Sequence, residues 1–330
     1  MPDRSPMRFT LLCAIQFLLA CGLSRAAGHD QTCDRACLHG LMDEYLAALV
    51  AHDPSRLATT PGVKFTENTN RMALGDGLWQ TIGSLGTFKL YIEDPQTRQA
   101  AFYGTVKENG VTALLGVRLK ESGRRLEEIE TFVVREASGI HGEFGRLIEA
   151  EPVWEQSIPR SERRSREAMT QIANRYFEGI VQGNGDIVPF AEDFSRTENG
   201  LQTASGSAGA SQPAQSQAAQ FSSKRFSYIH EITDRRFLLV DPERGLVYAV
   251  VMFQHPGNIK TDLFAPARGG GAGAAPSARG GSGTIAPRGF SLASYPNTTQ
   301  IIELFRISGG KIHRIFAYVS LLPYRQRPGW

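Results

Sequence analysis

The feature that most constrains the fold of this 330-residue chain is an internal repeat. Shifting the sequence against itself by 131 residues places residues 35–68 over residues 166–199 without a gap. The tripeptide Thr66-Glu67-Asn68 then coincides with Thr197-Glu198-Asn199. Apolar positions recur in both halves with the spacing of one helical face, at Leu38, Leu41, Tyr45 and Leu49 and at Met169, Ile172, Tyr176 and Ile180. The repeat predicts a duplicated domain, each copy of which opens with an amphipathic helix.

Later segments of the two copies align once insertions are allowed. Asp94-Pro95 aligns with Asp241-Pro242, residues 129–132 with 302–305, and Ile140-His141 with Ile312-His313. Strand-like runs follow each helix, at residues 63–66, 87–92, 99–107, 112–120 and 127–135, and at 235–240, 245–254, 300–307 and 311–321. A helix followed by antiparallel strands is the α+β pattern. A sheet that curls around its own helices would leave a conical pocket.

The first 27 residues predict an export signal. Arg4 and Arg8 precede an almost continuous apolar run at 9–23, and small residues at 24–27 offer a cleavage site. The run is shorter than the roughly 20 residues of a membrane-spanning helix, and no later stretch could span a membrane. We therefore expect a periplasmic or secreted protein. The residues before Cys21 also resemble a lipobox, so a lipid anchor at Cys21 is the alternative.

The remaining chain divides into two predicted domains. Copy one covers residues 33–153, a linker covers 154–161, and copy two covers 162–327. Copy two is longer because residues 202–220 and 265–289 are low-complexity inserts, which we expect to be disordered.

Several site classes find no support in the sequence. A net charge of +3 is too balanced to predict a nucleic-acid partner. No histidines have metal-site spacing and no glycine-rich phosphate loop joins a strand to a helix, so we expect neither a metal nor a cofactor. Cys33 and Cys37 have only His39 nearby as a further ligand, which favours a local disulfide or two free thiols over a zinc site.

One stretch of each copy is similar to a known superfamily. Residues 44–53, a short helical turn and then residues 64–68 resemble the opening of NTF2-like proteins, above all ketosteroid isomerase and the SnoaL-like cyclases. The resemblance implies two fused cone-shaped α+β barrels that pack as a pseudo-dimer, in a monomer or a homodimer. The layout also resembles tandem secreted proteins of fungi and bacteria, on residues that include 74–79, 198–200 and the ending 323–330. That second likeness implies the architecture and no activity.

The first resemblance also implies where a site would lie. Ketosteroid isomerase uses a helical tyrosine as an oxyanion donor and a strand aspartate as base. Tyr45 and Tyr176 match the tyrosine, whereas the aspartate position falls on Asn68 and Asn199, which cannot abstract a proton.

The neighbouring glutamates are the alternative bases. Glu67 shares a strand face with Phe65, so it would be a base in an apolar setting. In copy two, Arg196 shares the face of Glu198 and should neutralise it, which makes copy one the better catalytic candidate. Against this stands a purely structural Glu-Asn pair that caps the strand in both copies.

Two further residues complete the candidate site of copy one. Glu130 recurs as Glu303 and has Glu128 on the same strand face, so the carboxylates would share a proton, bind a cation, or lie on the open face of a half-exposed sheet. Trp79 would close the mouth of the cone and stack on a ligand, or pack against the neighbouring domain.

The sequence thus supports two functions. The first is a cofactor-free isomerase, dehydratase or lyase for a small, hydrophobic, cyclic molecule, with Tyr45 and Glu67 assisted by Asn68 and Glu130. The second is a non-catalytic ligand-binding or assembly protein.

Overall fold

The computed structural model describes the chain except residues 2–32, 137–141, 206–216, 224–225 and 258–294. From Thr32 onward the chain forms one compact unit. The predicted signal and Cys21 lie outside the described residues, as do Ile140, His141 and the insert at 265–289. None of the helices in the described part is long and apolar enough to cross a membrane.

The described part of copy one contains one α-helix and six strands: α1 (Arg35–Val50), β1 (Thr59–Glu67), β2 (Asn70–Arg71), β3 (Ile82–Asp94), β4 (Gln99–Glu108), β5 (Val111–Ser122) and β6 (Arg125–Arg135). Its 3-10 turns include η1 (Pro54–Arg56) and η2 (Gly77–Gln80). The described part of copy two contains α2 (Arg166–Gln182), β7 (Phe190–Glu198), β8 (Leu201–Ser205), α3 (Gln217–Ser222), β9 (Glu231–Asp241), β10 (Leu246–Pro256), β11 (Pro296–Ser308) and β12 (Lys311–Pro323). The predicted opening helices and strand runs are confirmed.

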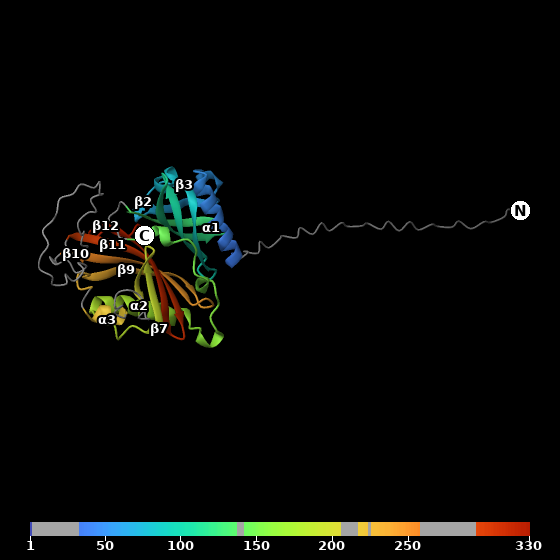
Figure 1. Ribbon diagram of the computed structural model, residues 1–330. Helices are drawn as coiled ribbons and strands as arrows, with labels where there is room; N and C mark the ends of the chain where they lie inside the picture. The colour runs from blue at the N-terminus through green and yellow to red at the C-terminus, as the bar shows by residue number, and fades with distance from the viewer. Residues whose placement is uncertain (2–32, 137–141, 206–216, 224–225, 258–294) are drawn as a thin grey trace, which may run out of the picture. The chain divides into compact units, whose positions relative to one another are not determined.

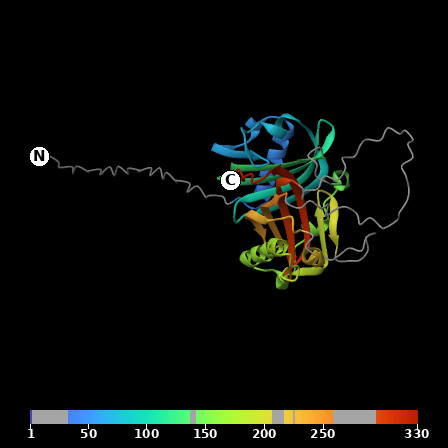
Figure 2. The same cartoon turned by 90° about the vertical axis from the view of Figure 1, so that its left-hand side faces the viewer.

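The two copies have the same strand order. One sheet runs β2-β1-β6-β5-β4-β3 and the other β8-β7-β12-β11-β10-β9. In each, a single parallel pair, β1 with β6 or β7 with β12, joins an otherwise antiparallel sheet. α1 packs on β3 and β4, and α2 packs on β9 and β10 (Figures 1 and 2). The repeat in the sequence is therefore a repeat in the fold.

Strand order corrects two of the sequence alignments. β6 corresponds to β12, so residues 129–132 of β6 are not equivalent to residues 302–305, which lie in β11. Glu130 is paired with Thr66, and the residue paired with the equivalent Thr197 is Phe316 rather than Glu303. Ile312 lies at the start of β12, which corresponds to the start of β6 and not to residue 140. Asp94-Pro95 and Asp241-Pro242 do occupy equivalent turns, after β3 and after β9.

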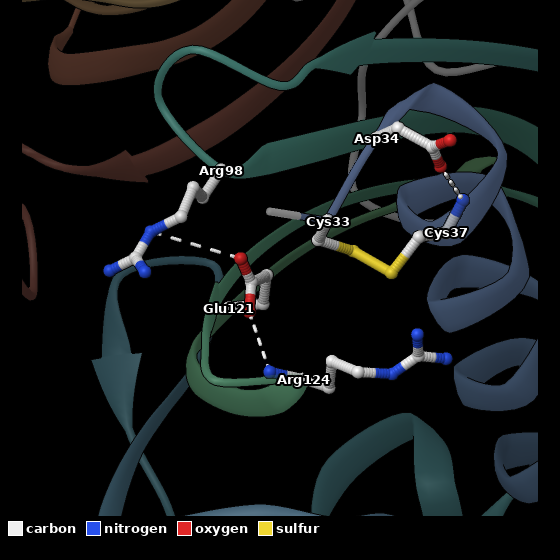
Figure 3. Close-up of a disulfide and its surroundings, with 6 residues drawn as sticks. All are labelled: Cys33, Asp34, Cys37, Arg98, Glu121 and Arg124. Carbon is white, nitrogen blue, oxygen red and sulfur yellow. Dashed lines mark hydrogen bonds and ion pairs between the residues drawn. A yellow bond between two sulfur atoms is a disulfide. The ribbon is translucent and has the colours of Figure 1, made fainter. Parts of the chain in front are cut away.

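The two long helices, α1 and α2, each begin at a side-chain cap. The Asp34 carboxylate accepts a hydrogen bond from the Cys37 backbone N–H at 2.9 Å, and a disulfide joins Cys37 to Cys33 across the first turn of α1 (Figure 3). The Ser165 hydroxyl caps α2 in the same way, and Gly183 ends that helix in the left-handed conformation with φ of 61°. Of the two alternatives expected for Cys33 and Cys37, the structure therefore has the local disulfide and not two free thiols.

The structure adds detail to the predicted insert and linker. The described parts of the 202–220 insert are not without secondary structure: they include most of β8 and the beginning of α3, and Ala204 and Phe221 of these elements are buried in the core of copy two. In the predicted linker, residues 154–161, Trp154 and Ile158 are buried.

The hydrophobic core has three clusters. One lies within copy one and one within copy two. The third draws residues from both copies, including Phe88, Tyr103, Phe132, Phe316 and Tyr318. Each sheet therefore buries one face inside its own copy and the other face between the copies.

An ion pair recurs in exchanged form across the two copies. The Arg35 Nη1 of copy one lies 2.9 Å from Asp241 Oδ2 of copy two, and the Arg166 Nη1 of copy two lies 3.0 Å from Asp94 Oδ1 of copy one. Arg35 is the repeat equivalent of Arg166, and Asp94 that of Asp241. Reciprocal contacts of this kind are what a two-fold interface produces.

Candidate functional site

Three of the predicted residues meet inside copy one. Tyr45 of α1 is fully buried, and its ring makes an edge-to-face contact with the Trp79 indole of η2 at 5.5 Å between centroids. Burial raises the pKa of the Tyr45 phenol, the Trp79 side chain opposes this, and the nearby charge of Glu67 adds to it. Within the described residues, neither the Tyr45 hydroxyl nor the Trp79 Nε1 has a hydrogen-bond partner of normal geometry. The Tyr45 hydroxyl oxygen and the Trp79 Nε1 are therefore two buried polar atoms without a well-formed hydrogen bond in the described part of the chain.

Glu67 brings a carboxylate to the same place. It is 8% exposed, on the strand face of the buried Phe65, as the alternation predicts. Its Oε2 accepts a hydrogen bond from the Leu78 backbone N–H at 2.8 Å, and its Oε1 lies 3.7 Å from Arg135 Nη2. Burial raises the pKa of Glu67, and the Leu78 amide and Arg135 only partly oppose it. Glu67 is thus a largely buried carboxylate with one long ion pair, to Arg135.

Arg135 binds Glu108 more closely than it binds Glu67. Its Nε and Nη2 contact the two carboxylate oxygens of Glu108 at 2.5 and 2.8 Å. Glu108 accordingly has a lowered pKa, chiefly through this hydrogen bond.

The η2 turn covers the Glu67 carboxylate. Gly77 has a φ of 69°, and a Cβ at this position would lie 2.5 Å from Glu67 Oε2. Only glycine permits so close an approach with this backbone conformation. His52 holds the other end of the turn, since its Nδ1 lies 2.5 Å from the Trp79 carbonyl oxygen. Trp79 therefore packs into the core of its own copy rather than against the neighbouring domain.

Asn68 serves the sheet. Its Nδ2 donates to the Val133 carbonyl at 2.9 Å, and its Oδ1 accepts from the Val133 N–H at 2.8 Å. Asn199 makes the same two bonds with Val319. The side-chain amide thus continues the parallel ladder past the end of the strand, which is the structural role weighed from the sequence.

Glu130 is not brought together with Tyr45 and Glu67. It pairs with Thr66 across the sheet, so its side chain is on the opposite face from Glu67. Arg118 and Arg236 bind it, at 2.9 and 2.5 Å. Although burial opposes the effect, these two guanidinium groups hold the pKa of Glu130 below its usual value.

The two predicted roles of the Glu128 and Glu130 pair are therefore wrong. Glu128 lies 2.8 Å from Arg118 Nη1, so the two carboxylates share a guanidinium rather than a proton or a cation. Glu130 is also only 6% exposed, because the outer face of this sheet is covered and not open to solvent.

Copy two replaces this arrangement with a buried ion cluster. Arg196 lies between Glu198 and Glu303, with Nη1 and Nη2 contacting them at 2.5 and 3.1 Å, so the predicted neutralisation of Glu198 is confirmed. Burial raises the pKa of Glu303 to about 7, although Arg196 opposes the shift. Tyr176 is also buried, which raises the pKa of its phenol. The nearby positive charge of Arg196 opposes this rise only in part.

Sequence reasoning missed the arginines that bind the carboxylates of copy one. Arg118 is 1% exposed in the middle of β5, where it binds Glu128 and Glu130. A lone charge inside an apolar strand run was the available signal for it. Arg135 lies at the end of β6 and carried no such signal. In the described ranges, no group of three or more His, Cys, Asp or Glu residues is placed to hold a metal ion.

Comparisons with known proteins give a family match and a set of solved structures. Residues 162–319 match a domain of unknown function, DUF8021, over just under half of the chain. No protein of curated function matches significantly.

The solved structures that match include SnoaL-like polyketide cyclases and NTF2-like proteins, the superfamily that the sequence resembles. A candidate polyketide cyclase from Silicibacter sp. TM1040 is 16% identical, with a TM-score of 0.29, and the match covers 47% of this chain and 90% of that one. A candidate SnoaL-like polyketide cyclase from Jannaschia sp. CCS1 is 11% identical, with a TM-score of 0.29, over 50% and 90%. An NTF2-like protein from Cytophaga hutchinsonii is 8% identical, with a TM-score of 0.26, over 30% and 92%. Likenesses at this level transfer no activity to the chain.

Proposed function

We propose that the interior of copy one binds a small, hydrophobic, cyclic molecule and that Tyr45 and Glu67 perform acid/base chemistry on it without a cofactor. One observation carries the proposal: a buried carboxylate, whose ion pair with Arg135 is as long as 3.7 Å, lies beside a buried phenol whose hydroxyl has no hydrogen-bond partner of normal geometry among the described residues. The apolar side chains of Phe65 and Trp79 supply a surface suited to a ring.

The chemistry follows from the two groups. Glu67, as carboxylate, takes a proton from the carbon next to a substrate carbonyl, and the electron pair moves onto the carbonyl oxygen. The Tyr45 hydroxyl donates a hydrogen bond to that oxygen and stabilises its negative charge. Return of the proton from Glu67 to a different carbon completes an isomerisation, whereas loss of a β-substituent makes the enzyme a dehydratase or lyase.

Access requires a movement of η2. The Leu78 N–H binds Glu67 and Gly77 packs on its carboxylate, so the turn covers the base. Displacing η2 breaks at least two hydrogen bonds, from the Leu78 N–H to Glu67 and between His52 Nδ1 and the Trp79 carbonyl, and uncovers Tyr45 and Glu67 together.

A non-catalytic role is the second candidate, and one observation favours it. Asn68 and Asn199 occupy the position of the expected base, and both are used by the sheet. In this case copy one would bind a ligand or support assembly without turnover.

We further propose that the protein is exported and that its two copies form a pseudo-dimer of cone-shaped domains, 33–153 and 162–327. The disulfide between Cys33 and Cys37 supports an oxidising compartment, whether periplasmic or extracellular, and with or without a lipid on Cys21. The exchanged Arg35 and Arg166 ion pairs support the pseudo-dimer.

Binding and turnover can be tested separately. 2-Naphthol is a suitable binding probe, because its ionised oxygen on a ring resembles an enolate. We expect Tyr45→Phe to weaken its binding severalfold, and Glu67→Gln to strengthen it, because the neutral amide no longer repels the bound anion. The repeat provides matched controls, since Tyr176→Phe and Glu198→Gln change the equivalent residues of copy two. Binding that neither copy-one variant alters would refute the site.

Conversion of 3-cyclohexenone to its conjugated isomer, followed by ultraviolet absorbance, tests turnover. Loss of this activity in Glu67→Gln, with the fold retained, supports catalysis. Binding of 2-naphthol together with no turnover of this or related ring ketones would favour the non-catalytic role.

A further inference from the structure

An open groove lies outside the interior of copy one, between α1 and the edge strand β3. Its volume is about 740 Å³, within the range of small-molecule sites. Leu46, Ala47 and Val50 of α1 form one side and Leu85 of β3 forms another. The irregular pairing of β3 with β4 between Leu85 and Lys89 marks a bulge beside the groove. The result is an apolar floor at the edge of a sheet.

The charged groups around this floor are unequal. The Asp43 carboxylate accepts a hydrogen bond from the Tyr91 hydroxyl at 2.8 Å, so the groove's carboxylate is already engaged. Lys89 is exposed, and among the described residues its ammonium group has no carboxylate within ion-pair distance. The guanidinium of Arg56 is 57% exposed, and its nearest carboxylate, Asp53, is at 4.0 Å. Two cations therefore remain available at the rim.

The position of Lys89 is what makes this arrangement unusual. Its neighbours Phe88 and Leu90 point into the cluster between the copies, so Lys89 and Tyr91 point to the α1 side of the sheet. A lysine on that side of an edge strand would protect the edge by itself. Lys89 also lies beside the apolar side chains of α1 that line the groove, and edge protection alone does not explain this position.

We propose that this groove binds a small amphipathic carboxylate, with its apolar tail on Leu46, Val50 and Leu85 and its carboxylate between Lys89 and Arg56. Charge complementarity selects this occupant, because the floor is apolar and two of the three charged side chains that line the groove, Lys89 and Arg56, are cations, against the single carboxylate of Asp43. The site is distinct from the proposed interior site, because Tyr45 and Leu46 leave α1 about 100° apart. It therefore does not depend on the proposed function.

Decanoate is a suitable probe, with 1-decanol as its uncharged counterpart of equal chain length. We expect calorimetry on the full chain, below the micelle concentration, to show tighter binding of decanoate than of decanol. Added salt should weaken decanoate binding and leave decanol binding nearly unchanged. Amide chemical shifts should move in α1 and β3.

Variants locate the contact. Because the cations are exposed, we expect Lys89→Gln to weaken decanoate about three- to fivefold, and the double variant with Arg56→Gln about tenfold. Lys311→Gln changes an exposed lysine at the start of β12 and is the matched control. Tyr45→Phe should also leave decanoate binding unchanged, which separates this site from the interior one.

Three results would overturn the proposal. The first is equal affinity for decanoate and decanol, and the second is an equal loss in Lys89→Gln and Lys311→Gln. The third is a self-associated form in sedimentation velocity that decanoate dissociates, since the groove would then be an interface with a second copy of the chain.

Discussion

Replacing Asn199 with alanine should lower the free energy of unfolding more than the equivalent replacement of Asn68 in copy one. The substitution leaves the Val319 N–H and C=O without partners, and both bonds are buried, at 3.0 and 3.2 Å. An unpaired buried backbone group costs about 1–3 kcal/mol. Alanine must also adopt the φ of 47°, at a further cost of about 1 kcal/mol. Because two such groups are left unpaired, we expect a loss of about 3–7 kcal/mol in the free energy of unfolding.

Two further variants, Asn199→Gly and Asn68→Ala, separate the cost of the lost hydrogen bonds from the cost of the backbone conformation and from the effect of burial. Asn199→Gly removes the backbone cost and keeps the loss of hydrogen bonds, so it should be about 1 kcal/mol milder than Asn199→Ala. Asn68→Ala breaks the equivalent bonds to Val133, but these are only partly buried and water can replace them. The loss there should be about 2 kcal/mol.

Guanidinium denaturation followed by far-ultraviolet circular dichroism measures all three variants against the unaltered chain. A loss below about 1 kcal/mol for Asn199→Ala would refute the reasoning, since the side-chain amide would then not support the ladder. A larger loss at Asn68 than at Asn199 would refute the dependence on burial.

Three further changes have defined outcomes. Thr69 has a φ of 72° where copy two has Gly200, so Thr69→Gly should relieve strain and raise the free energy of unfolding by about 1 kcal/mol; a decrease would show that packing of the threonine outweighs the strain. Gly77→Ala places a methyl group 2.5 Å from the Glu67 carboxylate, and should lower the melting temperature and alter 2-naphthol binding, whereas an unchanged melting temperature would mean that η2 moves at no cost. Because the pKa of Glu303 is raised from 4.5 to about 7, the folded chain holds a proton that the unfolded chain releases, so stability should fall as pH rises from about 4.5 through about 7. Glu303→Gln should flatten that part of the stability profile, and an unchanged profile would assign it to other groups.

The elements of the fold could be predicted because they depend on local pattern. The helical spacing of Leu38, Leu41, Tyr45 and Leu49 reflects burial on one face, and the structure buries all four. Repetition of the same pattern in copy two then required a second domain of the same kind. Both signals lie within one stretch of chain, which is why they can be detected without any knowledge of packing.

The faces of the strands could not be predicted to the same degree. β6 is buried on both sides, so Glu130 interrupts an apolar run and its alternation does not distinguish inside from outside. Its partner Arg236 lies 106 residues away, in the other copy. The alignment of Glu130 with Glu303 was wrong because it rested on an Ile-Glu pair followed by apolar residues. That short pattern can occur in any buried strand, so it does not identify which strands are equivalent.

Part of the candidate site was accessible from sequence. Tyr45 and Glu67 were found because the motif that contains them is short and continuous, and the structure places them together. The role of Asn68 depends on Val133, which is distant in the chain, and only three-dimensional pairing shows it.

The exchanged ion pairs bear on how the chain is made. Copy one leaves the ribosome first, yet Asp94 and the inter-copy side chains Phe88 and Tyr103 acquire their partners only when Arg166, Phe316 and Tyr318 have been synthesised. During that interval the nascent chain carries an exposed apolar sheet face beside a carboxylate without its arginine. Such a surface invites aggregation, so copy one should depend on a chaperone, or on slow compaction, until the second half of the chain arrives.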